Sequence, residues 1–230
     1  MNRTSLRLAA VLAGLAITTA ACGSSSDTTN TGSGSTATQD SGAVVGAEAT
    51  KTQGAELRAG LTYLLTEHVY LAGIATGTAV AKGGDLKNPA VGAAVAALDA
   101  NSVQLSKAVG AAYPAAEEPF LKSWRQHIGF FVDYTLGVAT KDAAKKAKAM
   151  KDLDGYRTSF GELINSVVPE LPADAVAMEL VPHVASLFTA IDDVVAGSPK
   201  TFADLATAAG HMPGTAATLA GGIAANKKLA

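Results

Sequence analysis

The clearest helical pattern in this chain lies in residues 120–138, which read FLKSWRQHIGFFVDYTLGV. Large apolar side chains and one histidine recur there at steps of three, four and seven residues: Phe120, Trp124, His127, Phe131 and Val138. Because an α-helix repeats every 3.6 residues, these side chains share one face. The stretch therefore predicts an amphipathic helix with a histidine in the middle of its buried side.

Two further stretches have the same arrangement. The first has the face Leu57, Leu61, Leu64, His68 and Leu71. The second has the face Val176, Leu180, His183, Leu187, Ile191 and Val194. Since a histidine again stands near the middle of each face, the sequence predicts three histidines in the core of the fold.

Proline and glycine divide the body of the chain into helical segments. We expect six helices, over about 55–81, 89–113, 115–139, 141–168, 171–197 and from 198 to near the C-terminus. Short connections favour antiparallel neighbours. The predicted fold is an all-α, up-and-down bundle of about six helices, in which Pro182 and Pro213 should introduce kinks.

The sequence also contains a faint internal repeat. A Leu-Asp pair at 98–99 precedes His127 by 28 residues, and a second pair at 153–154 precedes His183 by 29 residues. This spacing is what a duplicated helical hairpin would produce.

Residues 1–21 have the composition of a signal peptide. Two arginines provide a basic start, and the apolar run over 8–16 is too short for a permanent membrane span. Small residues then precede Cys22, the only cysteine, in an order that resembles the lipobox of bacterial lipoproteins, with Thr19 where leucine is usual. We therefore expect Cys22 to be acylated, by a chain such as palmitate. The alternative is ordinary cleavage before Cys22, which would leave a free thiol.

Composition sets the remaining boundaries. Residues 22–50 are mostly Ser, Thr, Gly, Asn and Asp, which is typical of a flexible tether. Residues 51–230 have the length of one helical domain. This organisation predicts a protein held by its N-terminal lipid at the extracytoplasmic face of the cell membrane. The net charge is −2 and there is no basic run, so we expect no nucleic-acid partner.

Four histidines occur, each near the middle of a predicted helix: His68, His127, His183 and His211. Mid-helix positions lie at similar heights in such a bundle, and bundle cores commonly hold metal sites. Imidazole suits copper, zinc and iron, and the sulfur of Met212 would favour cuprous copper. We therefore expect a transition-metal site, copper first and zinc or iron as alternatives, which loses its metal below about pH 6. Four mid-helix carboxylates are candidates for orienting the rings: Glu67, Asp99, Asp133 and Asp154.

Two other interpretations stay open. The histidines can be internal hydrogen-bonding groups of a non-enzymatic module that binds an envelope protein. Alternatively, the domain can carry a hydrophobic small molecule in a pocket lined by Phe130, Phe131 and Tyr134. The sequence has no Glu-x-x-His pair of the di-iron type, no nucleophile elbow and no phosphate loop. We therefore do not expect an enzyme.

Three segments carry a family resemblance: EHVYL at 67–71, WRQHIGFFVDY at 124–134, and LPADA at 171–175, which leads to His183. The chain resembles a family of exported bacterial helical domains that is often labelled through its association with copper amine oxidase N-terminal-type modules. The resemblance covers about residues 56–223. It implies an exported helical domain with histidines at these positions, and it does not imply amine oxidase activity.

Overall fold

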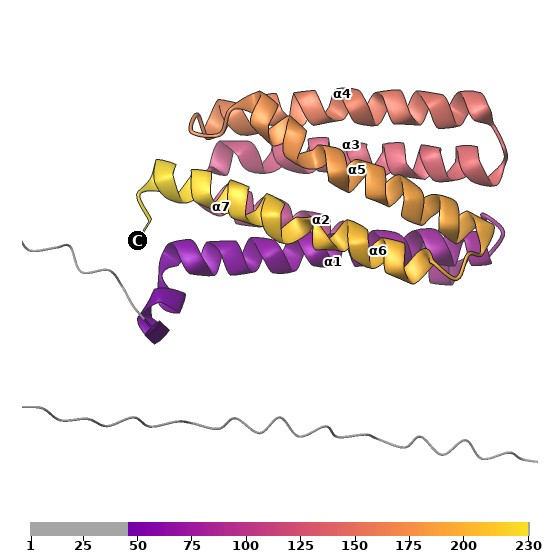
Figure 1. Cartoon of the computed structure of the whole chain (residues 1–230), viewed down its shortest axis with the longest axis horizontal. Coiled ribbons are helices and arrows are strands. Elements are labelled where there is room, and N and C mark those ends of the chain that lie inside the picture. Colours follow the sequence, from indigo (N-terminus) through magenta and orange to yellow (C-terminus); the bar gives the residue numbers. More distant parts are fainter. Residues whose placement is uncertain (1–45, 230) are drawn as a thin grey trace, which may run out of the picture. The chain divides into compact units, whose positions relative to one another are not determined.

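The computed structural model describes residues 46–229 (Figure 1). The predicted signal peptide, the lipidation of Cys22 and residues 22–45 of the predicted tether lie outside the described residues. The end of the predicted tether is helical instead, because the 3-10 helix η1 spans Gly46–Lys51. An ion pair of 3.0 Å joins Glu48 in its first turn to Lys51 in its last. Helical structure therefore begins before the predicted boundary at residue 51.

The described residues form an all-α bundle, as predicted. The α-helices are α1 (Gln53–Ala81), α2 (Pro89–Ala112), α3 (Glu117–Ala139), α4 (Ala143–Val167), α5 (Ala173–Ala196), α6 (Thr201–Gly210) and α7 (Met212–Lys227), and a 3-10 turn η2 spans Pro114–Ala116. The ends of the first five predicted helices agree with α1 to α5 to within about two residues. The predicted sixth helix is the exception.

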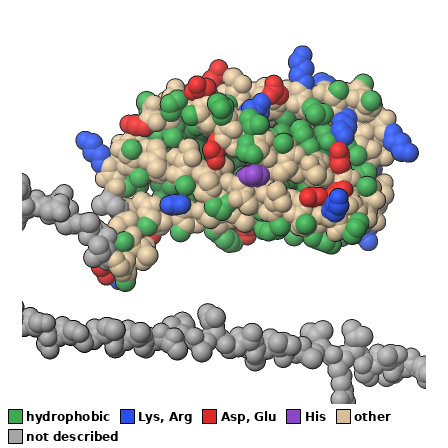
Figure 2. Space-filling model, viewed as in Figure 1, with side chains coloured by type: hydrophobic (Ala, Val, Ile, Leu, Met, Phe, Trp, Pro, Cys, Tyr) green, Lys and Arg blue, Asp and Glu red, His purple; other side chains and the backbone are tan. Residues whose placement is uncertain are grey.

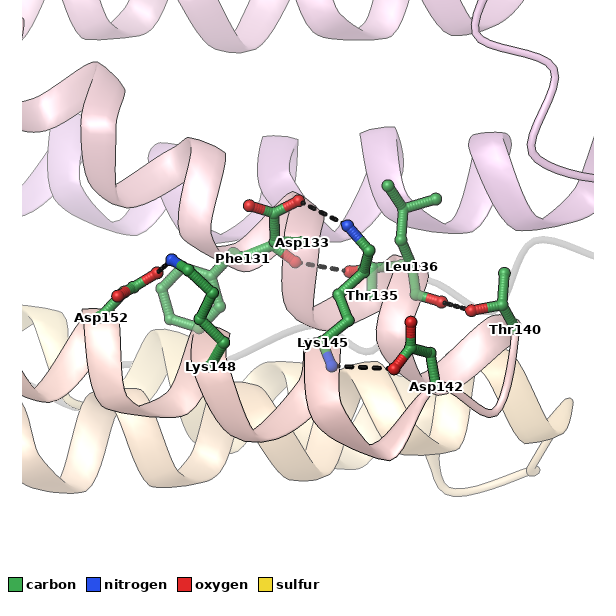
Figure 3. Close-up of polar contacts among 9 residues, drawn as sticks. All are labelled: Phe131, Asp133, Thr135, Leu136, Thr140, Asp142, Lys145, Lys148 and Asp152. Atoms are coloured by element: carbon green, nitrogen blue, oxygen red, sulfur yellow. Dashed lines mark hydrogen bonds and ion pairs between the residues drawn. The ribbon is translucent and has the colours of Figure 1, made fainter.

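Side-chain hydrogen bonds cap the starts of several of these helices. Thr52 accepts a hydrogen bond from the backbone N–H of Ala55 at the start of α1 (3.2 Å). Asp142 accepts one from the N–H of Lys145 at the start of α4 (2.9 Å), as Figure 3 shows. Such caps satisfy N–H groups that have no partner inside the helix. At the other end of α5, Gly197 adopts a left-handed φ of 64°, which favours glycine.

The helices form a closed ring in chain order. Each of α1 to α6 packs against its neighbour, and α6 and α7 together return along α1 to close the ring. Figure 1 shows α1, α3 and α5 running in one direction, with α2 and α4 running in the other. The helices α1, α3 and α5 also contact one another across the interior. The middle of the bundle is therefore built from these three helices.

The predicted sixth helix is two helices, which is a correction to the expected single kinked helix. The helix α6 ends at Gly210 and α7 begins at Met212, with His211 between them. Pro213 lies in the first turn of α7, where its missing N–H costs no helical hydrogen bond. Pro182, by contrast, lies inside α5, which continues through it.

The helix α5 has two distinct sides. One contributes the buried core residues Val176, Leu180, His183, Leu187, Ala190 and Ile191. The other leaves Met178 exposed at the surface. By length and composition α5 is also the one helix of residues 46–229 apolar enough to cross a membrane, a test that core helices of soluble proteins also pass.

Gly161 marks a close approach between α4 and α5. A side-chain carbon at this position would overlap the backbone carbonyl oxygen of Ala173, the first residue of α5. Gly155, earlier on the same helix, has open space around it. The pair therefore separates the effect of the close approach from the general effect of glycine in a helix.

We predict that Gly161→Ala lowers the free energy of unfolding by about 1–3 kcal/mol, because a backbone atom blocks the added methyl group. Gly155→Ala should raise it by up to about 1 kcal/mol, since alanine is the better helix former. Chemical denaturation followed by circular dichroism measures both changes. Equal changes at the two positions would contradict the packing of α4 against α5.

Candidate functional site

Three of the four histidines are buried in the middle of the bundle. His68 on α1, His127 on α3 and His183 on α5 have exposed fractions of 3%, 5% and 7%. They lie on the three helices that meet across the interior. His211 is only half-buried, at the junction of α6 and α7, and Figure 2 shows a histidine at the surface of the face that these helices cover. The structure thus places three predicted residues inside the core and one at its edge.

One small cavity adjoins all three buried rings. Its volume is about 30 Å³, and its lining includes His68, His127, His183, Trp124, Tyr156 and Met212. A space of this size accommodates one or two water molecules or a single ion. It is too small for a lipid or an organic cofactor. Of the predicted metal ligands, Met212 therefore joins the three buried histidines, whereas His211 does not line the cavity.

Aromatic rings hold two of the imidazoles in place. The ring centroids of His68 and His127 are 5.4 Å apart, and the Trp124 ring lies 4.9 Å from the first and 4.5 Å from the second. The ring of Tyr156 stacks on His127 at 4.9 Å. Since each imidazole is enclosed by large rings, its orientation is fixed by packing.

A chain of polar groups from α1 and α2 reaches the first imidazole. The amide of Asn101 donates hydrogen bonds to the carbonyl oxygen of Leu64 (3.0 Å) and to Glu67 (2.8 Å). Its oxygen is therefore free to face His68. The Nδ1 atom of His68 and the Asn101 oxygen are both buried without a partner in good hydrogen-bond geometry, yet Asn101 lies close enough to favour the protonated ring. The Asn101 side chain therefore lies beside the His68 ring without a regular hydrogen bond to Nδ1.

Of the other two imidazoles, His183 has an acceptor beside Nδ1. The Nδ1 atom of His183 lies 3.4 Å from the carbonyl oxygen of Ala208 on α6. For His127, the backbone of Trp124 favours the protonated ring, although Nδ1 has no partner in good hydrogen-bond geometry. When Nδ1 carries the hydrogen, the lone pair of a neutral imidazole is on Nε2. This tautomer leaves one lone pair on each of the three rings, which line the same cavity.

Burial keeps these rings neutral. It lowers the pKa of His68 from 6.5 to about 3 and that of His183 to about 4, and it holds the pKa of His127 well below its ordinary value. Desolvation is the main cause, and repulsion between the rings adds to it for His68 and His127. The expected loss of metal below about pH 6 is therefore not supported, because the folded rings remain unprotonated there.

The four carboxylates that were predicted to orient the histidine rings divide into two groups. Glu67 reaches the site through Asn101 and also accepts a hydrogen bond from the Tyr63 hydroxyl (2.6 Å). The other three form ion pairs at the surface: Asp99 with Arg125, Asp133 with Lys145, and Asp154 with Arg157. Figure 3 shows Asp133 and Lys145 facing each other beside the turn between α3 and α4. The structure therefore places one of the four beside the imidazole layer.

The spacing of the rings suits a metal only in part. Two imidazoles on one tetrahedral ion, with metal–nitrogen bonds of about 2 Å, have ring centroids about 5 Å apart. The 5.4 Å between His68 and His127 is close to that value. Within residues 46–229, however, no three His, Cys, Asp or Glu side chains are arranged to hold a metal. Any third ligand would have to be Met212 or a reoriented His183.

Two polar residues of the site, Asn101 and Tyr156, were not predicted from the sequence. Asn101 lies on the inward side of α2 among the buried residues Leu98, Ser102, Leu105, Ser106 and Val109. The signal that could have revealed Asn101 is a polar side chain at the three- and four-residue spacing of the buried positions of α2. Tyr156 is buried, and its hydroxyl has no partner in good geometry, although Ser123 is near enough to affect its pKa. Its spacing alone did not distinguish it from an ordinary core aromatic residue.

The residues of the hydrophobic-carrier interpretation do not form one pocket. Tyr134 stacks on Phe188 at 4.2 Å and donates a hydrogen bond to Asp192 (3.0 Å), so it is a core residue. Phe131 adjoins the histidine cavity, whose size excludes a lipid. Phe130 is a partly buried residue packed against the core.

Comparisons of the chain with protein-family models, with curated proteins and with solved structures found no match. The family resemblance based on residues 67–71, 124–134 and 171–175 therefore stays a prediction.

We predict that acid destabilises this fold through its buried histidines. Because the folded pKa values lie below 6.5, the unfolded chain binds more protons at acid pH. Stability should be complete above about pH 7 and should decrease from pH 6.5 toward pH 4, by about 1 kcal/mol per pH unit for each buried imidazole. Urea denaturation at pH 7.5, 6 and 5 measures this slope.

The variant His183→Leu provides the control. It removes one titrating group, so its stability should depend less steeply on pH than that of the parent protein. Denaturation curves that coincide at pH 7.5 and pH 5 would show that the rings are not buried in neutral form.

Proposed function

We propose that this protein is an extracytoplasmic, lipid-anchored lipoprotein whose helical body binds one transition-metal ion, copper first, in the cavity between His68, His127 and His183. The observation that carries the proposal is that three neutral imidazoles from three helices line one small cavity. The Ala208 carbonyl beside Nδ1 of His183, and the Asn101 amide beside the His68 ring, favour the tautomer in which Nε2 is available as a ligand.

The tautomer supports ligand chemistry. Metal-binding histidines almost always donate their second N–H to a carboxylate, a carbonyl or a water, which fixes the ring and raises its basicity. Here Asn101, connected to Glu67, takes that role for His68, and the Ala208 carbonyl takes it for His183. The lowered pKa values add to this, because protons compete less with a metal for a ring that stays neutral.

The softness of the site favours copper. Met212 is 2% exposed and lines the cavity with the three rings. A thioether is a soft, neutral ligand that prefers cuprous copper, whereas zinc and iron sites more often include carboxylates or thiolates. His68 and His127, with Met212 or His183 as a third ligand, form the set that we propose. His211 lies outside it.

The alternative is that the histidines only stabilise the bundle. The contact between His183 and the Ala208 carbonyl favours that interpretation. The buried Nδ1 atoms of His68 and His127, which lack good partners, count against it. A buried polar atom without a partner costs about 1–3 kcal/mol, so a purely structural role for these two rings would weaken the fold rather than strengthen it.

We predict that the purified protein binds one Cu(I) or Zn(II) ion and that His127→Leu abolishes binding, because leucine has no donor atom. His211→Ala should bind as the parent protein does, since His211 does not line the cavity. Isothermal titration, or competition with a chromophoric chelator, measures both. Absence of binding by the parent protein, or undiminished binding by His127→Leu, would refute the metal site.

Stability separates the two interpretations independently. If the rings serve a metal, metal-free His127→Leu should be as stable as the parent protein at pH 7, or more stable by about 1 kcal/mol, because an apolar group of similar size replaces a poorly partnered one. If the rings are structural, the same variant should be clearly less stable. Thermal melting in the presence of a chelator distinguishes the outcomes.

The anchor has its own test. We predict that Cys22→Ser releases the protein from the membrane fraction into the soluble fraction, because serine provides no thiol for acylation. Metabolic labelling with a fatty acid should mark the parent protein and not the variant. Labelling that persists in Cys22→Ser would place the lipid elsewhere.

A further inference from the structure

The lining of the histidine cavity carries no formal charge. It consists of apolar and neutral polar side chains, with no Asp, Glu, Lys or Arg among them. Glu67, the carboxylate connected to this layer, is separated from it by the neutral amide of Asn101. Metal sites for divalent ions usually include thiolates or carboxylates that compensate the charge of the ion. This cavity offers imidazole, thioether, hydroxyl and indole groups instead.

Charge compensation matters here because the site is lined mainly by buried, apolar side chains. Moving an ion from water into a medium of low dielectric constant is costly, and in the Born description the cost rises with the square of the charge. Among neutral ligands a divalent ion keeps two uncompensated positive charges, whereas a monovalent ion keeps only one such charge. The walls include Trp124, Phe160 and Leu153, each at most 7% exposed, so the surroundings of an ion there are largely apolar.

We propose that the histidine cavity is a site for a soft monovalent cation, Cu(I), and that it discriminates against divalent ions through the absence of an anionic ligand. This inference rests on the proposed metal-binding function and specifies its substrate. Softness comes from Met212 and the imidazoles. Selection by charge comes from the lining, which has no anionic side chain to compensate the charge of the ion.

Thr215 provides a way to test the charge argument directly. It lies on α7, is 5% exposed and lines the cavity beside Met212. Replacing it by Asp adds a carboxylate to the lining, and replacing it by Asn adds an uncharged group of the same shape. The pair changes charge while it keeps volume, so a difference between the two variants reports on charge alone.

The experiment compares two pairs of ions. Ag(I) and Cd(II) are both soft ions with a filled d shell, and they differ in charge. Cu(I) and Zn(II) form the second pair, which is measured under anaerobic reducing conditions. Affinities of the full-length protein are measured by chelator competition at pH 7.5. We expect the parent protein and Thr215→Asn to bind the monovalent ion at least about a hundredfold more tightly in each pair. In Thr215→Asp this preference should fall at least about tenfold.

The possible failures are distinguishable. If the parent protein binds none of the four ions, the proposed function and this inference both fail. If it binds Cd(II) or Zn(II) as tightly as the monovalent partner, the metal site stands and selection by charge is overturned. If Thr215→Asp keeps the preference of Thr215→Asn, the neutral lining is not its cause. The comparison within the parent protein decides the question even where Thr215→Asp fails to fold.

Discussion

The packing of three imidazoles in the interior is the constraint on which the rest of this structure depends. Every buried ring brings two nitrogen atoms that need partners, in a medium where an unmatched polar group is costly. Neighbouring elements meet this need in part: the Ala208 carbonyl of α6 lies 3.4 Å from Nδ1 of His183, and the Asn101 amide of α2 lies beside the His68 ring. Large rings fill the remaining space, because Trp124 and Tyr156 lie within 5 Å of His127.

The break between α6 and α7 is related to the same packing of buried imidazoles. A continuous helix would return along α1 with a regular face. The interruption at His211 instead ends α6 shortly after the carbonyl that faces His183 and begins α7 with the buried Met212. Pro213 fits the start of α7 at little energetic cost, because the backbone N–H that proline lacks has no hydrogen-bond partner in the first turn of a helix. The region that the sequence predicted as one helix is therefore the part that completes the wall of the cavity.

The fold could be predicted from the sequence because it depends on local patterns. The apolar faces around His68, His127 and His183 identified the three inner helices, and Pro89 and Gly197 marked helix ends correctly. Contacts between distant residues were beyond such patterns. That Asn101, and not Asp99, would face an imidazole depends on the rotation of α2, and a shift of two positions along a helix turns a side chain by about 200°. The position of each histidine along its helix could be predicted, whereas which side chains point into the core could be predicted only in part.

The energetics of the site connect its chemistry to its stability. His68 and His127 each bury an Nδ1 atom without a good partner, and the hydroxyl of Tyr156 and the indole nitrogen of Trp124 are in the same condition. Four such groups around one layer are costly in a domain whose net stability is small. An ion in the cavity would polarise the rings it binds and strengthen the contacts at their Nδ1–H groups, because a coordinated imidazole is a better donor than a free one. Metal binding and folding stability would then be coupled through the same atoms.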